Sequence, residues 1–174
     1  MNDIIENIKT QDEPLEKCSW YAAKVFFNKT EPFAKVLDEM SIQYYIPSSV
    51  ITSLAFFRCT HNQARQLQYQ RFSQIYVYTR SGSRDPFPIP DREMEVFIFV
   101  TSANDKDMLL LGDDRPEYHL GDRVRVTEGP FKGAEGHVKR IKKDRRLVVT
   151  IPGVVAVATA FIPPQFLEKI DSWH

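Results

Sequence analysis

The chain has 174 residues, which is room for one compact domain or two small ones. Lys plus Arg and Asp plus Glu number 23 each, so the overall charge neither favours nor excludes a nucleic-acid partner. The chain contains no apolar run as long as a membrane span, which argues against an integral membrane protein. Cys18 and Cys59 fit no metal-ligand spacing and are typical of free thiols in a reducing cytoplasm.

Residues 1–17 are rich in acids and lack the apolar core of a signal peptide, so a flexible leader is expected there. Residues 18–27, with the sequence CSWYAAKVFF, have the apolar and aromatic content of a central strand. Thr30 or Asn28 is suited to cap the helix that follows. That helix would carry one apolar stripe, formed by Phe33, Val36, Leu37 and Met40.

Further strands are predicted over residues 42–47, 51–59 and 74–79. A short helix capped within residues 60–62 separates the last two, and Asp91 is suited to cap a further helix after a loop rich in proline. This succession predicts an α+β sandwich over residues 18–103, with helices on a mostly antiparallel sheet.

Residues 104–118 have the acids, glycine and proline of a linker between two domains. Within them, residues 108–111 are too apolar for a free tether and are expected to pack on a domain. A second domain is therefore predicted over residues 119–174.

Short strands with turn signals between them run through the second domain. Residues 123–127 alternate polar and apolar, residues 129–133 form a turn, and residues 136–141 and 147–151 supply two more strands. A last strand over residues 154–160 would be followed by closing contacts from Phe166, Leu167 and Ile170. This spacing predicts a small, strongly bent barrel, in which Gly136 marks a bulge or a close backbone approach.

Residues 121–151 resemble the KOW motif, which occurs in NusG transcription elongation factors and in some ribosomal proteins. The features that match are the leading Gly121-Asp122, the alternating strand, the turn over residues 129–133, and Gly136 followed by Val138 and Ile141. The resemblance implies a small SH3-like β-barrel.

The first domain resembles the NGN domain of NusG proteins. Trp20-Tyr21 opens the first strand, Glu31 starts the first helix, residues 45–47 end the second strand, and residues 88–91 precede the last helix. Residues 52–54 replace the usual proline-glycine-tyrosine, and residues 48–50 stand where many members have a long basic hairpin. These departures favour a specialised paralogue similar to the operon-specific antiterminators RfaH and UpxY.

The resemblance implies a cytoplasmic elongation or antitermination factor that binds the clamp helices of the RNA polymerase β′ subunit and reduces pausing or termination. By position in the motif, the polymerase-binding patch comprises Ile51, Leu54, Phe56, Ile75 and Tyr78, with Tyr44 and Phe87 as neighbours. The contact with the opposite gate region falls on His61, Arg65 and Gln66. Alternation along the third strand places Leu54 and Phe56 outside, and Ala55 and Phe57 in the core.

In the KOW domain, the family implies a ribosomal protein or a termination factor as partner. Nucleic acid is the alternative partner, because the domain carries a run of basic residues. A hairpin tip that is solvated and binds nothing is given about the same weight as contact with nucleic acid. The run comprises Lys139, Arg140, Lys142, Lys143, Arg145 and Arg146. The protein partner is favoured because Glu135 and Asp144 dilute this run, and because Phe131 is the segment's one aromatic that could stack on bases.

Two further classes of function are weighed against this hypothesis. One is an RNA-binding or ribosome-associated module in which the KOW domain carries the activity. The other is an enzyme, which is disfavoured because the sequence has no phosphate-binding glycine loop and no recognisable nucleophile motif. The four histidines are scattered, so neither a metal nor a cofactor is expected.

Overall fold

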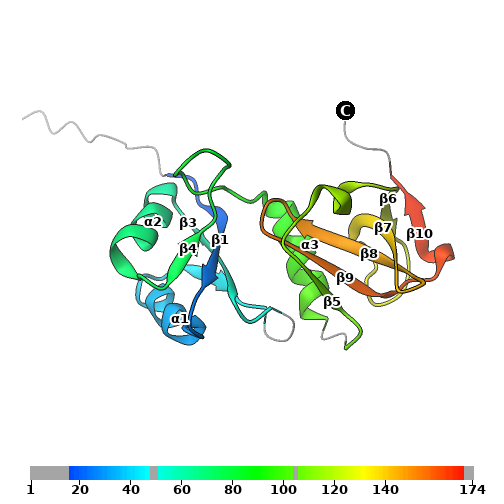
Figure 1. Ribbon diagram of the computed structural model, residues 1–174, viewed down its shortest axis with the longest axis horizontal. Helices are drawn as coiled ribbons and strands as arrows, with labels where there is room; N and C mark the ends of the chain where they lie inside the picture. Colours follow the sequence, from blue (N-terminus) through cyan, green and yellow to red (C-terminus); the bar gives the residue numbers. More distant parts are fainter. Residues whose placement is uncertain (1–15, 48–50, 104–105, 171–174) are drawn as a thin grey trace, which may run out of the picture.

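The computed structural model describes residues 16–47, 51–103 and 106–170, so most of the predicted leader lies outside the described residues. The fold is α+β, as predicted, with two antiparallel sheets and one long helix between them (Figure 1). Among the described residues, no helix combines the length and apolar character needed to cross a membrane.

The N-terminal sheet has the strand order β2-β3-β1-β4, and every neighbouring pair is antiparallel. One face packs against α1, α2 and a π-helical turn, η1, around a core that contains Phe33, Leu37 and Phe57. The strands are β1 (Ser19–Val25), β2 (Gln43–Tyr45), β3 (Leu54–Cys59) and β4 (Ile75–Val77), and the helices are α1 (Thr30–Glu39), α2 (His61–Gln66) and η1 (Leu67–Arg71).

Of the three predicted helix caps, one is confirmed. Thr60 caps α2 in a capping box with Gln63, since its side chain accepts from the Gln63 amide at 3.2 Å while the Gln63 side chain accepts from the Thr60 amide at 3.0 Å. The predicted caps of α3 (Asp91–Ser102) and α1 are wrong. Asp91 is itself the first residue of α3, which follows Pro90, and no side chain among the described residues caps that helix. Thr30 is already the first helical residue, and its hydroxyl donates instead to the Thr52 carbonyl at 3.0 Å.

The opposite face of the N-terminal sheet is covered by α3 (Asp91–Ser102). The Phe97 ring lies 5.1 Å from that of Phe56 between centroids. Thr101 donates to the Phe97 carbonyl and lies 2.7 Å from the Tyr45 hydroxyl, and Arg58 pairs with Asp91 at 3.3 Å. Aromatic packing and these polar contacts therefore fix α3 on the sheet.

The C-terminal sheet has the order β10-β6-β7-β8-β9-β5 and is antiparallel throughout. Its hydrogen-bonded ladder is not closed between β10 and β5 in the described residues. A Cβ atom on Gly136 would lie 2.4 Å from the Val148 carbonyl oxygen, which confirms the predicted close approach. The strands are β5 (Leu109–Gly112), β6 (Arg123–Val126), β7 (Glu135–Ile141), β8 (Asp144–Ile151), β9 (Val155–Phe161) and β10 (Leu167–Lys169), with 3-10 turns η2 (Pro116–His119) and η3 (Pro164–Phe166).

Part of the segment predicted to be a linker is the edge strand β5, which pairs with β9. Met108 is buried just before it, as the apolar character of residues 108–111 predicted. The Arg146 guanidinium donates to the Asp107 carbonyl at 2.7 Å and ties this segment to β8. The chain therefore joins the C-terminal sheet soon after α3.

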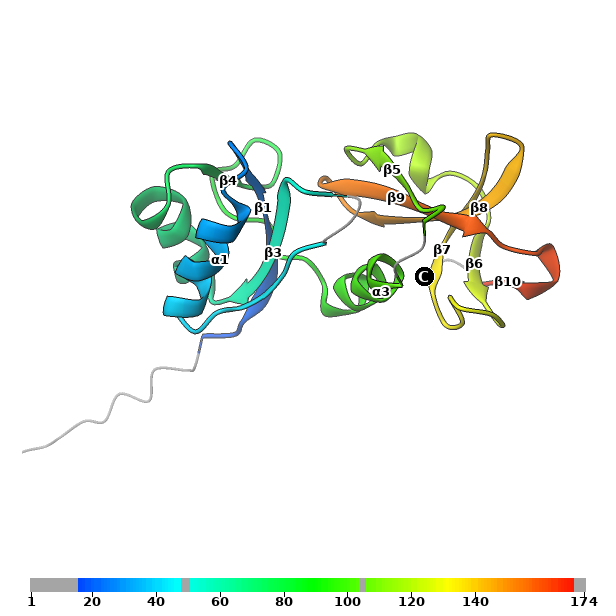
Figure 2. The ribbon, with the colours of Figure 1, turned by 90° about the horizontal axis from the view of Figure 1, so that it is seen from below.

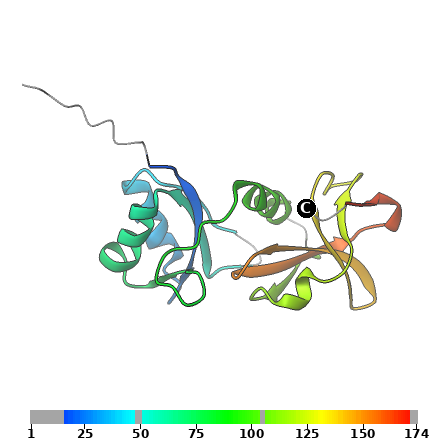
Figure 3. The ribbon, with the colours of Figure 1, turned by 90° about the horizontal axis from the view of Figure 1, so that it is seen from above.

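Helix α3 is shared by the two sheets, and Figures 2 and 3 show it between them. It contacts β1 on one side and β8 on the other, and one continuous hydrophobic core runs from Phe56 through Phe97 to Val149. The two sheets are thus held together by buried apolar surface, which is the main stabilising term in folding.

A buried carboxylate, Glu135 on β7, reinforces this contact. It accepts hydrogen bonds from Arg92 of α3 at 2.5 Å, from Arg125 of β6 at 2.8 and 3.0 Å, and from Arg123 at 3.3 Å. Burial alone would raise the pKa of Glu135, but the hydrogen bonds and charges of Arg125 and Arg92 outweigh it and lower the pKa. Glu135 is therefore the ionic centre of the interface.

Candidate protein-binding site

The predicted division of β3 into two faces is confirmed, but the expected exposure of its outer face is wrong. Ala55 and Phe57 lie in the core beneath α1 and α2, and Leu54 and Phe56 point to the other side. There Phe56 is fully buried against Phe97 of α3, and Leu54 is only 5% exposed in the same core, which also contains the buried Ile51. In this arrangement these three side chains are core residues.

The assignment of Ile75 to the outer face is also wrong. Ile75 pairs with Val25 and is buried beneath the helices, while Tyr76 points to the other face and is 46% exposed. Tyr44 packs on the helix side of the sheet as well, and its hydroxyl donates to Asp38 at 3.3 Å. It is therefore no neighbour of the predicted patch.

The aromatic residues left accessible beside α3 form a surface that we call the aromatic face, which consists of Phe26, Tyr76, Tyr78 and Phe87. The rings of Tyr76 and Tyr78 are 5.7 Å apart, and the Phe87 amide donates to the Tyr78 carbonyl at 3.0 Å. Phe26 continues the β1 ladder through its amide, which donates to Gln74 at 2.9 Å, and is 39% exposed. Alternation along β1 and β4 puts Phe26 and Tyr76 on one side.

Basic side chains border the aromatic face. Lys24 is exposed and lies directly opposite Tyr76 in the β1–β4 register. The Arg80 guanidinium lies 5.7 Å from the centroid of the Phe87 ring, within the range of a cation–π contact. The surface is thus apolar in the middle and cationic at its rim.

The C-terminal domain reaches the same surface through its β8–β9 turn. A cavity of about 200 Å³ is lined on one side by Tyr78, Arg80 and Phe87, and on the other by residues 152–154 of that turn. The turn is held in place by Asp114, which accepts from the Gly153 amide at 2.9 Å. Tyr78 and Phe87 are therefore half-covered, while Phe26 and Tyr76 lie more open.

The three residues predicted for the gate contact lie together on α2. His61 and Arg65 approach the same Asp85 oxygen at 3.8 and 3.9 Å, and Gln66 is exposed beside them. Asp85 belongs to the proline-rich loop, and sequence reasoning did not link it to α2. These contacts place the proline-rich loop beside α2.

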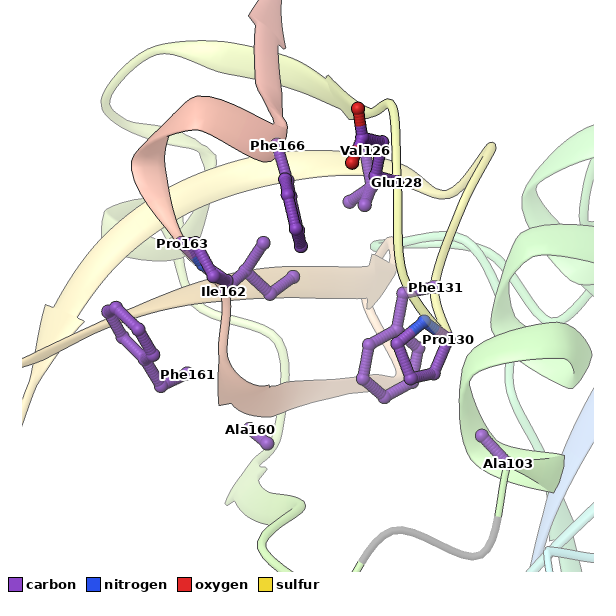
Figure 4. Close-up of a pocket in the computed structure, with 10 residues that line it drawn as sticks. All are labelled: Ala103, Val126, Glu128, Pro130, Phe131, Ala160, Phe161, Ile162, Pro163 and Phe166. Carbon is purple, nitrogen blue, oxygen red and sulfur yellow. The ribbon is translucent and has the colours of Figure 1, made fainter.

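A second apolar hollow of about 360 Å³ lies in the C-terminal domain (Figure 4). Phe131 and Pro130 of the turn after β6 form one wall, Phe166 and Ile162 another, and Ala103 at the end of α3 lies at its edge. Glu128 is the one charged residue in its lining, which is otherwise made of Ala103, Val126, Pro130, Phe131, Ala160, Phe161, Ile162, Pro163 and Phe166.

A polar cavity of about 450 Å³ separates the N-terminal end of α3 from β7 and β8, and both Glu93 and His137 line it. Burial raises the pKa of Glu93, while burial and then the charge of His119 lower the pKa of His137. In the part of the chain that the structure describes, no group of three or more residues is placed to bind a metal ion. The cavity belongs to the interface between α3 and the C-terminal sheet.

The predicted basic residues occupy the β7–β8 hairpin. Arg140, Lys142, Lys143 and Arg145 are exposed and Lys139 is half-buried. The side chain of Arg146 is only 11% exposed and donates to the carbonyls of Asp107 and Thr159, so its role here is structural.

Comparison with known proteins bears on the C-terminal domain. Residues 120–151 match the KOW motif. This confirms the resemblance drawn from the sequence for that segment. The structure is also similar to that described as "Domain interaction in Thermotoga maritima NusG", with a TM-score of 0.49, 18% sequence identity, and coverage of 89% of this chain and 98% of that one. None of the curated proteins matches the sequence.

Proposed function

We propose that this protein is a transcription elongation or antitermination factor of the NusG kind, which binds RNA polymerase and catalyses no reaction. The match of residues 120–151 to the KOW motif supports an association with transcription or with RNA. The NGN-like features of the first domain, including Trp20-Tyr21 and Pro88–Asp91, favour transcription. Such a factor acts in the cytoplasm.

The observation that carries the proposal is the exposed aromatic face. Phe26, just after β1, and Tyr76 of β4 are partly exposed to solvent, and aromatic rings supply large apolar contact area. Aromatic residues and arginine dominate the energetics of protein interfaces, and Lys24 and Arg80 add a cationic rim. We assign the contact with the β′ clamp helices to this surface, and the contact with the gate region to His61, Arg65 and Gln66.

The absence of the long basic hairpin at residues 48–50, and the replacement of the usual motif at residues 52–54, favour an operon-specific paralogue comparable to RfaH or UpxY. The C-terminal domain would recruit a further protein, such as a ribosomal protein or a termination factor. The apolar hollow beside Phe131 and Phe166 suits such a contact, because buried apolar area drives association.

Replacing Phe26 and Tyr76 together by serine is expected to weaken the binding of core RNA polymerase strongly. Truncation of an interface aromatic at a hot spot costs about 2 kcal/mol or more, so the double variant should lose at least about a hundredfold in affinity. The two rings are partly exposed, so the protein should stay folded. Biolayer interferometry with immobilised protein measures the affinity.

Tyr69→Ser is the matched control, since Tyr69 is 58% exposed on η1, on the other side of the sheet from the aromatic face. It should bind polymerase like the wild type. Equal affinities for the wild type and the double variant would refute the assignment of this surface.

A further inference from the structure

The β7–β8 hairpin carries cations whose charge is not neutralised within the molecule. In the described residues, no ion pair involves Lys139, Arg140, Lys142, Lys143 or Arg145. The nearest acid in the chain, Asp144, lies 3.8 Å from the largely buried Arg146. Glu135 lies at the other end of β7, where it binds Arg92, Arg123 and Arg125. Of the two acids that dilute the basic run in the sequence, Glu135 thus lies outside it in space, and Asp144 stays in the hairpin and approaches Arg146.

The hairpin keeps this charge in spite of a local cost. Lys139 lies opposite Arg146 and Arg140 opposite Arg145, and like charges directly opposite each other destabilise a β-ladder. A polyanion bound across the hairpin would relieve this repulsion.

The turn is unfavourable as well. Lys142 and Lys143 have φ angles of 50° and 74°, which is the geometry of a type I′ turn. That turn strongly prefers Asn-Gly, because residues with a Cβ atom are strained there. Two lysines at these positions therefore lower the local stability of the turn, and they place two positive charges at the tip of the hairpin.

The hairpin lies far from the aromatic face. The eight residues of β8 span about 26 Å, with the basic turn before Asp144 and the turn of residues 152–154, beside Tyr78, at the other end. Figure 2 shows the hairpin at the side of the C-terminal domain that points away from the N-terminal sheet. A ligand on the hairpin would therefore leave the aromatic face free.

We infer that the β7–β8 hairpin binds the phosphate backbone of double-helical nucleic acid without reading its sequence. Residues 139–146 contain no aromatic side chain on which the bases of a single strand could stack. A two-stranded β-ribbon fits the major groove of DNA, and a duplex offers the denser array of phosphates. This inference does not rest on the proposed polymerase contact, which involves the other domain.

The test is fluorescence anisotropy with the full chain, a labelled DNA duplex and one of its single strands, at several NaCl concentrations. With four to five phosphates contacted, log K should fall with log salt at a slope of about −4 for the duplex. Lys142→Gln combined with Lys143→Gln should make that slope shallower by about 2. Lys29→Gln combined with Lys35→Gln removes the same charge from the N-terminal domain and should leave the slope unchanged.

A second variant separates binding from folding. Lys142→Asn combined with Lys143→Gly installs the preferred type I′ turn, so it should raise the melting temperature while weakening duplex binding. The aromatic-face variant Phe26→Ser/Tyr76→Ser should bind the duplex like the wild type. Duplex binding that survives in both hairpin variants, an equal loss in the Lys29/Lys35 control, or tighter binding of the single strand would overturn the inference.

Discussion

Phe56→Ala is expected to lower the free energy of unfolding by about 4 kcal/mol, since removing a buried phenylalanine side chain costs about 3–5 kcal/mol. The side chain is fully buried, packs at a tilt against Phe97 of α3, and belongs to the core that continues into the C-terminal sheet. The cavity left behind would be enclosed by α3, so little relaxation is expected. Urea denaturation of the full chain, followed by circular dichroism, measures the loss.

Phe99→Ala is the control on the same helix. Phe99 is 42% exposed, so its truncation should cost less than about 1 kcal/mol. Similar losses for the two variants would mean that α3 does not cover β3. If Phe56→Ala costs much more than Phe99→Ala, the outer face of β3 is part of the core. A charged residue at Leu54 or Phe56 would then disturb folding, so such a variant could not test polymerase binding.

Glu135→Gln is expected to lower the free energy of unfolding by about 3 kcal/mol. Removing one partner of a buried ion pair costs about 3–5 kcal/mol, and the lower end applies here because Arg92 and Arg125 are partly exposed. The substitution keeps the shape of the side chain but leaves Arg92, Arg123 and Arg125 clustered without an anion. At this chain length, the melting temperature should fall by about 10 °C. Glu168→Gln, on the exposed edge strand β10, is the control and should change little.

The pH dependence of this loss follows from the pKa of Glu135. In the folded protein the hydrogen bonds and charges of Arg125 and Arg92 hold the pKa of Glu135 below its ordinary value of 4.5, so the carboxylate contributes stability above pH 4.5. That contribution is lost as the pH falls below 4.5 through the folded pKa. The stabilities of wild type and Glu135→Gln should therefore differ most near neutral pH and converge in acid. A difference that is constant with pH would contradict the ionic role of Glu135.

Local patterns in the sequence predict much of this fold, because they depend on neighbouring residues alone. Alternation along β3 separates Phe56 from Phe57, Thr60 and Gln63 form a capping box, and Gly136 approaches β8 closely. The covering of Phe56 by α3 was not predictable in this way, since it depends on how a distant helix packs.

The candidate site was predicted less well than the fold, for two physical reasons. In a strand, neighbouring residues point to opposite faces, so a shift of one residue puts Ile75 on the face that Tyr76 occupies. The correct face could have been predicted from the sequence, because Tyr76 stands between the apolar Ile75 and Val77. Glu135 is close in sequence to the basic run, so the sequence suggests that it dilutes the positive charge. The sequence does not show that Arg92, on another element, neutralises Glu135.

The central claim, that the aromatic face binds RNA polymerase, is tested most directly by site-specific photocrosslinking. A photoreactive phenylalanine analogue at position 76 places the reactive group on the aromatic face, and the same analogue at position 69 places it on the other side of the sheet. With core RNA polymerase, position 76 should crosslink to the β′ clamp helices and position 69 should not. Crosslinking from position 69 alone, or from neither position while the complex still forms, would contradict the account.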